Sequence, residues 1–192
     1  AEDHFDQRFE YYAEEHGRIQ VITDSVLFEQ AINPKLTLQG EFVYDTISGA
    51  TPTGATPPTG SKKIPMAELE ETRYAGNAMA NWHLGNHTVS PQFAYSSESD
   101  YESLGIALND AIDFNQKNTT LTLGVSHDFD RIQPVFWKTP KHKNSSDFLI
   151  GLTQLLTPKT IATVNFTFGK SNGYLADPYK RVHFDGYDDP TG

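Results

Sequence analysis

The feature that most constrains this chain is a hydrophobic alternation with a period of two residues, which recurs along most of its length. Between residues 36 and 45, leucine and aromatic residues occupy the even positions, with Gly40 among them, and Thr, Gln, Glu and Asp occupy the odd ones, broken only by Val43. Such alternation is typical of β-strands with one apolar and one polar face, and no segment carries helical spacing over three turns. We therefore expect an all-β protein with about nine strands, in segments 5–12, 18–32, 36–45, 72–84, 87–97, 103–114, 120–130, 147–156 and 163–168.

Short and long connections alternate between these segments. The short connections are rich in Asn, Gly and Pro, which suit tight turns, and they lie at 33–35, 85–86, 115–118 and 157–159. The longer polar connections lie at 48–69, 96–101 and 131–146, with a tail from Ser171. In an up-and-down antiparallel sheet, alternate connections lie at opposite ends. One end therefore carries the short turns and the other carries the long loops.

This organisation is that of a membrane barrel. A sheet in lipid must close on itself, and its strands need about 9–11 residues, with apolar side chains toward lipid and polar ones toward the lumen. Bacterial barrels add short periplasmic turns, longer outer loops and aromatic girdles. Tyr44, Tyr74 and Tyr95 fall near the long-loop ends, and Trp82 and Phe114 near the short turns. We therefore expect an antiparallel up-and-down transmembrane β-barrel, porin-like, in the outer membrane of a Gram-negative bacterium.

Composition removes several function classes. The chain has 192 residues, a net charge of -10 and a sequence pI near 5.0, which argues against nucleic-acid binding. The absence of cysteine excludes disulfides, Cys-ligated metals and thiol nucleophiles, and fits an oxidising periplasm. A Gly-x-Ser-x-Gly nucleophile elbow is absent as well. We expect a non-enzymatic protein with no cofactor, metal site or catalytic residue, and keep as an alternative a barrel enzyme that uses lumen carboxylates.

We expect one β-barrel domain over residues 1–192, incomplete at its C-terminus. Nine strands is an odd number, whereas single-chain bacterial barrels have an even number. Residues 174–192 read as a polar, acidic loop rather than as a closing apolar strand. The sequence therefore predicts the N-terminal part of a larger barrel, to which the rest adds an odd number of strands.

Polar positions of the strands provide the candidate functional residues. In a functional interpretation they line a solute path or form an internal salt-bridge network. In the structural alternative they only fill the interior, because small barrels pack hydrogen-bonded polar groups there. Arg73 is expected to pair with Glu41 or Asp45 on the neighbouring strand and fix its register. Lys138, Lys141, His142 and Lys143 are expected in a solvated basic outer loop. The expected lumen-facing residues are Asp24, Glu41, Asp45, Arg73, Asn77, Gln92, Asn109, Asp113 and Asp128.

A soluble β-rich binding module is the main alternative, because a β-sandwich also alternates. Such a module would bind carbohydrate or another ligand, using Trp137 and tyrosine rings. The two interpretations differ in one respect. In a barrel, Phe42, Ile106 and Phe166 point outward to lipid; in a sandwich they interdigitate in a dry core.

Several motifs resemble those of an uncharacterised bacterial family of predicted outer-membrane β-barrels. The most specific is Val43-Tyr44-Asp45 followed by 48–52, and the others are 11–15, 18–21, 72–73, 95–98, 100–101, 118–120 and 177–180. The resemblance implies an outer-membrane location and a barrel fold. For such a barrel we expect contact with lipid, lipopolysaccharide and other envelope or surface proteins. The resemblance also points to a role beside an extracytoplasmic redox system, but it implies no established activity and assigns no functional residue. From the strand alternation and the alternating loop lengths we expect a scaffold, an anchor or a narrow pore.

Overall fold

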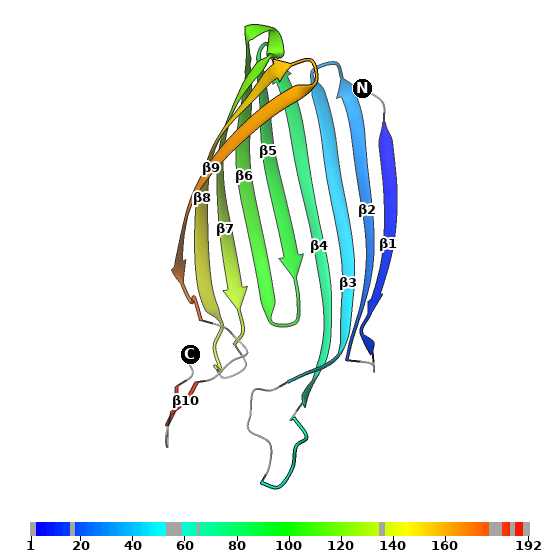
Figure 1. Ribbon diagram of the computed structural model, residues 1–192, viewed down its shortest axis with the longest axis vertical. Helices are drawn as coiled ribbons and strands as arrows, with labels where there is room; N and C mark the ends of the chain where they lie inside the picture. The colour runs from blue at the N-terminus through cyan, green and yellow to red at the C-terminus, as the bar shows by residue number, and fades with distance from the viewer. Residues whose placement is uncertain are drawn as a thin grey trace.

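Nine strands form one antiparallel sheet in chain order, so every strand pairs with its sequence neighbours (Figure 1). The computed structural model describes residues 3–15, 18–52, 59–64, 66–134, 137–176, 182–184 and 187–189. Within these residues, no helix has the length and apolar composition needed to cross a membrane. The strands are β1 (His4–Ala13), β2 (Ile19–Asn33), β3 (Leu36–Pro52), β4 (Met66–Leu84), β5 (His87–Ser97), β6 (Tyr101–Phe114), β7 (Thr119–Ile132), β8 (Lys141–Thr157) and β9 (Thr160–Gly173).

The two ends of the sheet differ as the sequence predicts. The tight turns β2–β3, β4–β5, β6–β7 and β8–β9 all lie at the upper end in Figure 1, and the connections β3–β4, β5–β6 and β7–β8 lie at the lower end. At the β6–β7 turn, residues 115–117 (η2) take positive φ angles, which Asn tolerates better than most residues. Two lower connections are shorter than expected: β5–β6 spans only 98–100, and β8 already begins at Lys141.

The sheet is a single curved layer, and most of its large apolar side chains point away from its concave side. Phe42, Ile106 and Phe166 are 52 %, 48 % and 62 % exposed. Among the described residues, Ile132 is the one buried hydrophobic residue in the core besides the enclosed Pro134. A soluble sandwich would bury these side chains between two layers, so the observed arrangement contradicts that alternative and confirms the barrel-type sheet.

Aromatic side chains gather where headgroups would lie. The rings of Tyr44 and Tyr74, which are register partners on the apolar face of β3 and β4, have centroids 5.2 Å apart. Tyr95 lies on the same face toward the long-loop end, whereas Trp82 and Phe114 lie near the short turns. Rings with an apolar body and a polar tip favour the membrane–water interface. We call Tyr44, Tyr74 and Tyr95 together the outer aromatic belt.

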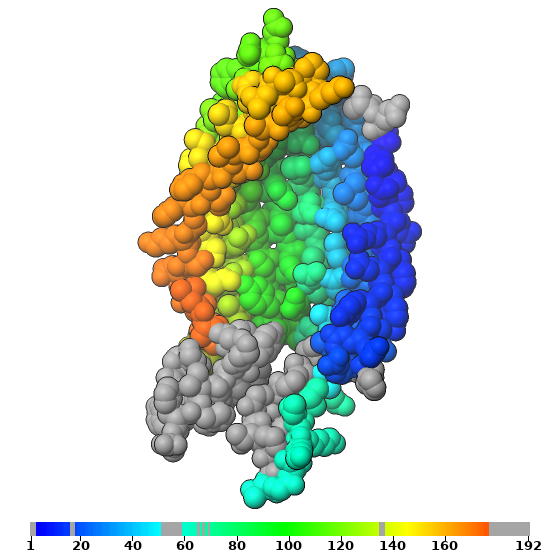
Figure 2. Space-filling model, viewed as in Figure 1, coloured from blue at the N-terminus to red at the C-terminus, as the bar shows by residue number. Residues whose placement is uncertain are grey.

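The described sheet is open. Within the described residues, β1 pairs with β2 alone and β9 with β8 alone, and because neighbours alternate in direction, β1 and β9 run the same way. The space-filling view is hollowed between these two edges (Figure 2). Beyond β9, β10 (Val182–Phe184) and β11 (Tyr187–Asp189) form a separate two-stranded sheet, where the sequence predicts only a polar loop. The motif at 177–180 lies outside the described residues.

Candidate functional site on the polar concave face

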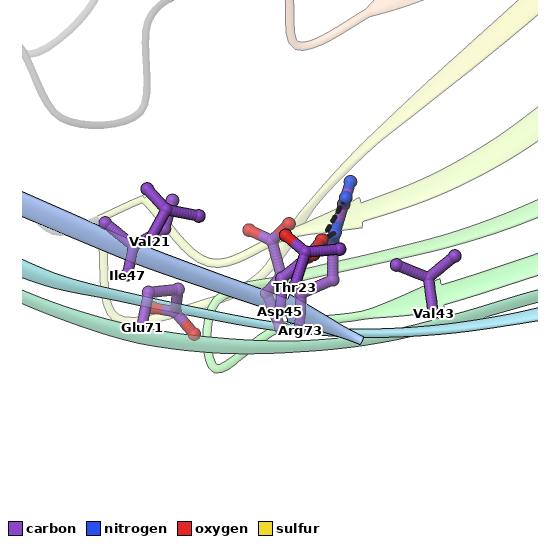
Figure 3. Close-up of a pocket in the computed structure, with 8 residues that line it drawn as sticks. Val21, Thr23, Val43, Asp45, Ile47, Glu71 and Arg73 are labelled. Atoms are coloured by element: carbon purple, nitrogen blue, oxygen red, sulfur yellow. Dashed lines mark hydrogen bonds and ion pairs between the residues drawn. The ribbon is translucent and has the colours of Figure 1, made fainter. Parts of the chain in front are cut away.

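Strand register places most of the expected lumen residues on one face. Glu41 and Asp45 pair directly with Asn77 and Arg73. Their side chains alternate with that of Phe42 and so lie on the opposite face, which is the concave one (Figure 3). The residues that share this face are Glu41, Asp45, Arg73, Asn77, Gln92, Asn109, Asp113 and Asp128.

Asp24 does not share that face, and the expectation that it faces the lumen is corrected. It pairs in register with Tyr44, so it lies on the convex face, where its Oδ1 accepts a hydrogen bond of 3.2 Å from Gln7. The alternation in segment 18–32 is irregular, because Val21 and Leu27 place apolar residues on the other phase. The phase of β2 therefore cannot be read from its own residues and is fixed only by pairing with β3.

The central polar contact of the concave face joins β3 and β4. The Arg73 guanidinium donates to Asp45, with Nε 2.8 Å from Oδ2. The Asp45 side chain is only 10 % exposed, against 45 % for Arg73, so the guanidinium offsets a carboxylate that is largely removed from water. This pair is the one expected from the sequence, and it holds β3 and β4 in register. Four residues further along each strand, Asn77 Nδ2 donates to Glu41 over 3.0 Å.

Glycines on neighbouring strands make room for other polar side chains of this face. Asp128 pairs with Gly105, and Asn109 pairs with Gly124. A Cβ added at either glycine would collide with the side-chain oxygen of its partner, 2.7 Å away in the case of Asp128. Toward the short turns, Thr120 Oγ1 donates to Asp113 over 2.7 Å. The acidic and amide side chains therefore lie flat across the neighbouring strand.

A second charged cluster lies at the long-loop end of β6–β8. Its residues are not among the lumen-facing residues expected from the sequence. Lys143 Nζ lies 2.9 Å from Asp130 Oδ2 and donates to the Tyr101 hydroxyl over 2.9 Å. The expected basic outer loop is therefore corrected: Lys143 belongs to β8, with its charge matched by the buried Asp130. Lys141 also lies in β8, 3.8 Å above the Trp137 ring, which is not free for a sugar on that side. The opposite charges of Asp130 and Lys143 are the one sign of this cluster in the sequence. Recognising that they pair requires the register of β7 and β8.

A hollow opens in the concave face at the long-loop end of β2–β4 (Figure 3). We call it the mouth hollow, and its volume is about 420 Å³. Three branched apolar side chains and the Asp45–Arg73 pair project from the same side of the sheet in Figure 3. A second hollow of about 250 Å³ lies among Glu41, Gln92 and Asp128. The lining of the mouth hollow is Val21, Thr23, Val43, Asp45, Ile47, Glu71, Arg73 and Glu98.

Two further carboxylates lie on the rim of the mouth hollow. Glu71 accepts hydrogen bonds from the Ser99 N–H (2.9 Å) and from the Ser99 hydroxyl (2.7 Å). Glu98 lies in the connection between β5 and β6, outside the membrane-spanning strands. Burial raises the pKa of the Glu98 carboxyl above its ordinary value; Arg73 opposes the rise, and neighbouring carboxylates reinforce it.

One solved structure has the same fold as this sheet. It is OmpT (in-vitro folded), an outer membrane protein of Vibrio cholerae, with a TM-score of 0.56 at 11 % sequence identity. The match covers 87 % of this chain and 53 % of that chain, so the chain spans about half the length of OmpT. The fold is therefore that of an outer-membrane β-barrel protein. A comparison with curated proteins gives no match.

A family model covers almost the entire sequence. The model matches residues 1–65, 59–142 and 136–189, and its description is "Protein of unknown function (DUF3570)". These ranges include all nine strands of the sheet and the mouth hollow. The chain belongs to the DUF3570 family of proteins of unknown function.

Proposed function

We propose that this protein forms a β-barrel in the bacterial outer membrane whose interior is a narrow, water-filled path for small solutes. The convex face would contact acyl chains and, at its long-loop end, lipopolysaccharide. The concave face would line the path. The observation that carries the proposal is the division of the sheet into an exposed apolar face and a largely polar face.

The charge of the concave face sets the ion selectivity that we expect of the path. Over β3–β8, carboxylates on this face outnumber cations, and only two of the carboxylates form an ion pair with a Lys or Arg there. Rings or patches of carboxylates in a pore favour cations over anions. The carboxylates are Glu41, Asp45, Glu71, Asp113, Asp128, Asp130 and Asp147, and the cations are Arg73, Lys141 and Lys143.

Conductance in planar lipid bilayers tests this proposal. Protein purified from outer membranes, as cells make it, is inserted between unequal KCl solutions, and current and reversal potential are recorded. We expect stepwise conductance with a reversal potential of the sign that K⁺ selectivity gives. A folded, inserted protein that passes no current contradicts the pore.

A scaffold or anchor is the second candidate, and the interior contacts favour it. Arg73–Asp45, Asn77–Glu41 and Lys143–Asp130 fix neighbouring strands, as interior polar groups do in barrels that conduct nothing. An insulating barrel that co-purifies with a defined envelope protein would support this role. A place beside an extracytoplasmic redox system, implied by the family resemblance, stays a prediction, and so does the absence of enzymatic activity.

A further inference from the structure

Three apolar side chains of the mouth hollow do not belong to the lipid-facing surface. Val21 and Ile47 are register partners on β2 and β3, and Val43 follows on the same side of β3. All three lie on the concave face, opposite to Phe42 and Tyr44, so acyl chains cannot reach them. They interrupt the polar alternation of this face at its long-loop end. A patch of branched apolar groups inside a polar wall gives a ligand an apolar surface to cover.

The charged part of the mouth hollow is negative. The Arg73 guanidinium is matched by Asp45, with which it forms the ion pair. Glu71 receives its hydrogen bonds from neutral groups, those of Ser99 and the Thr72 N–H, which leave its charge in place. Glu98 adds a further carboxylate on the rim. The lining thus contains three carboxylates and one guanidinium. The excess charge complements a cation that enters between the two glutamates.

We propose that the mouth hollow is a binding site for an organic ammonium ion with an apolar body. The branched patch of Val21, Val43 and Ile47 would contact the body, and Glu71 and Glu98 would face the cationic group. A volume of about 420 Å³ falls in the range of about 300–1,000 Å³ typical of small-molecule sites. The proposal deepens the proposed function, since it names a solute class for the path, but binding itself does not require conduction.

Calorimetric titration with benzyltrimethylammonium chloride tests the site. The protein is used as cells make it, in an uncharged detergent, with protein-free micelles as the blank and benzenesulfonate as the charge-reversed probe. We expect saturable binding of the ammonium ion and none of the sulfonate. Absence of saturable binding by folded protein overturns the site. This is also the result expected if a segment of the chain itself fills the hollow. Equal binding of both probes overturns it too.

Variants locate the binding. Glu98→Gln removes one rim charge and is expected to weaken the affinity about three- to tenfold, and Ile47→Asn weakens it by disrupting the apolar patch. Glu102→Gln is the matched control, since Glu102 lies at the same end but on the convex face, 2.8 Å from Arg131. Equal losses for Glu98→Gln and Glu102→Gln contradict the site. Binding without conductance would refute the pore alone, and conductance without binding would refute the site alone.

Discussion

The two faces of the same strands obey opposite rules. On the convex face, Phe93 and Ile106 are register partners and remain about half exposed, with nothing packed over them. On the concave face, Asp45 of β3 and Asp130 of β7 are buried and paired with cations. Apolar groups outside and polar and charged groups inside reverse the order of a soluble protein. The difference shows that the sheet is built for a nonaqueous exterior and a polar interior.

A charge placed on the convex face should give the largest effect. Ile106→Arg puts a guanidinium near the middle of β6, where arginine at the bilayer midplane costs about 2–4 kcal/mol. Gln92→Arg is the matched change on the concave face, one residue out of phase in the same region, and should cost far less. Urea unfolding of the protein in lipid vesicles measures both. Equal losses of unfolding free energy would refute the distinction between the faces.

Breaking the Asp45 ion pair should rank second. Arg73→Ala leaves a carboxylate that is 10 % exposed without its guanidinium. Because Arg73 itself is 45 % exposed, water partly replaces it, and we expect a loss of about 1–2 kcal/mol. Arg131→Ala, which breaks the exposed pair with Glu102, is the control and should cost at most about 0.5 kcal/mol. The same unfolding experiment compares them, and a larger loss for Arg131→Ala would contradict this ranking.

The fit of side chains across the concave face can be tested at Gly124. A methyl group there collides with Asn109 Oδ1, so Gly124→Ala should destabilise the sheet by about 1 kcal/mol through overpacking. Adding Asn109→Ala removes the obstructing oxygen and should restore part of the loss. A double-mutant cycle of unfolding free energies measures this coupling. Additive effects would show that the two residues do not compete for space.

The smallest effect concerns pH at the mouth hollow. The raised pKa of Glu98 means that its carboxylate takes up a proton at a higher pH than an ordinary glutamate, whose value is 4.5. The affinity for the ammonium probe should therefore fall as pH decreases, beginning above 4.5, and Glu98→Gln should lose that part of the pH dependence. Titrations across this range measure it. A wild-type midpoint at or below 4.5 would contradict the burial of Glu98.

Local sequence predicts the strands and their turns, because each side chain reports directly on the face to which it points. The alternation around Phe42 and Phe93, and the turn residues at Gly85-Asn86, were sufficient. Features that depend on strand register cannot be predicted from local sequence in the same way. The phase of Asp24 and the pairing of Lys143 with Asp130 both depend on which residue of the next strand lies opposite.

The mouth hollow illustrates the same limit. Its one visible sign in the sequence is Val43, the exception within an otherwise regular strand. Val21 and Ile47 join it only through the pairing of β2 with β3, and Glu98 only because the β5–β6 connection folds beside β4. Strand lengths were also underestimated. β3 and β4 reach Pro52 and Met66, since the sheet continues beyond the outer aromatic belt, where the alternation weakens.

Site-directed spin labelling tests the central claim most directly, because the chain contains no cysteine and each label is therefore unique. Phe42→Cys, Ile106→Cys and Phe166→Cys sample the convex face, and Glu41→Cys, Gln92→Cys and Asp128→Cys the concave face. In protein reconstituted into lipid vesicles, labels on the convex face should relax with oxygen dissolved in lipid and ignore a water-soluble nickel chelate. Labels on the concave face should show the reverse. Equal access of the nickel chelate to both sets would contradict a lipid-facing convex surface.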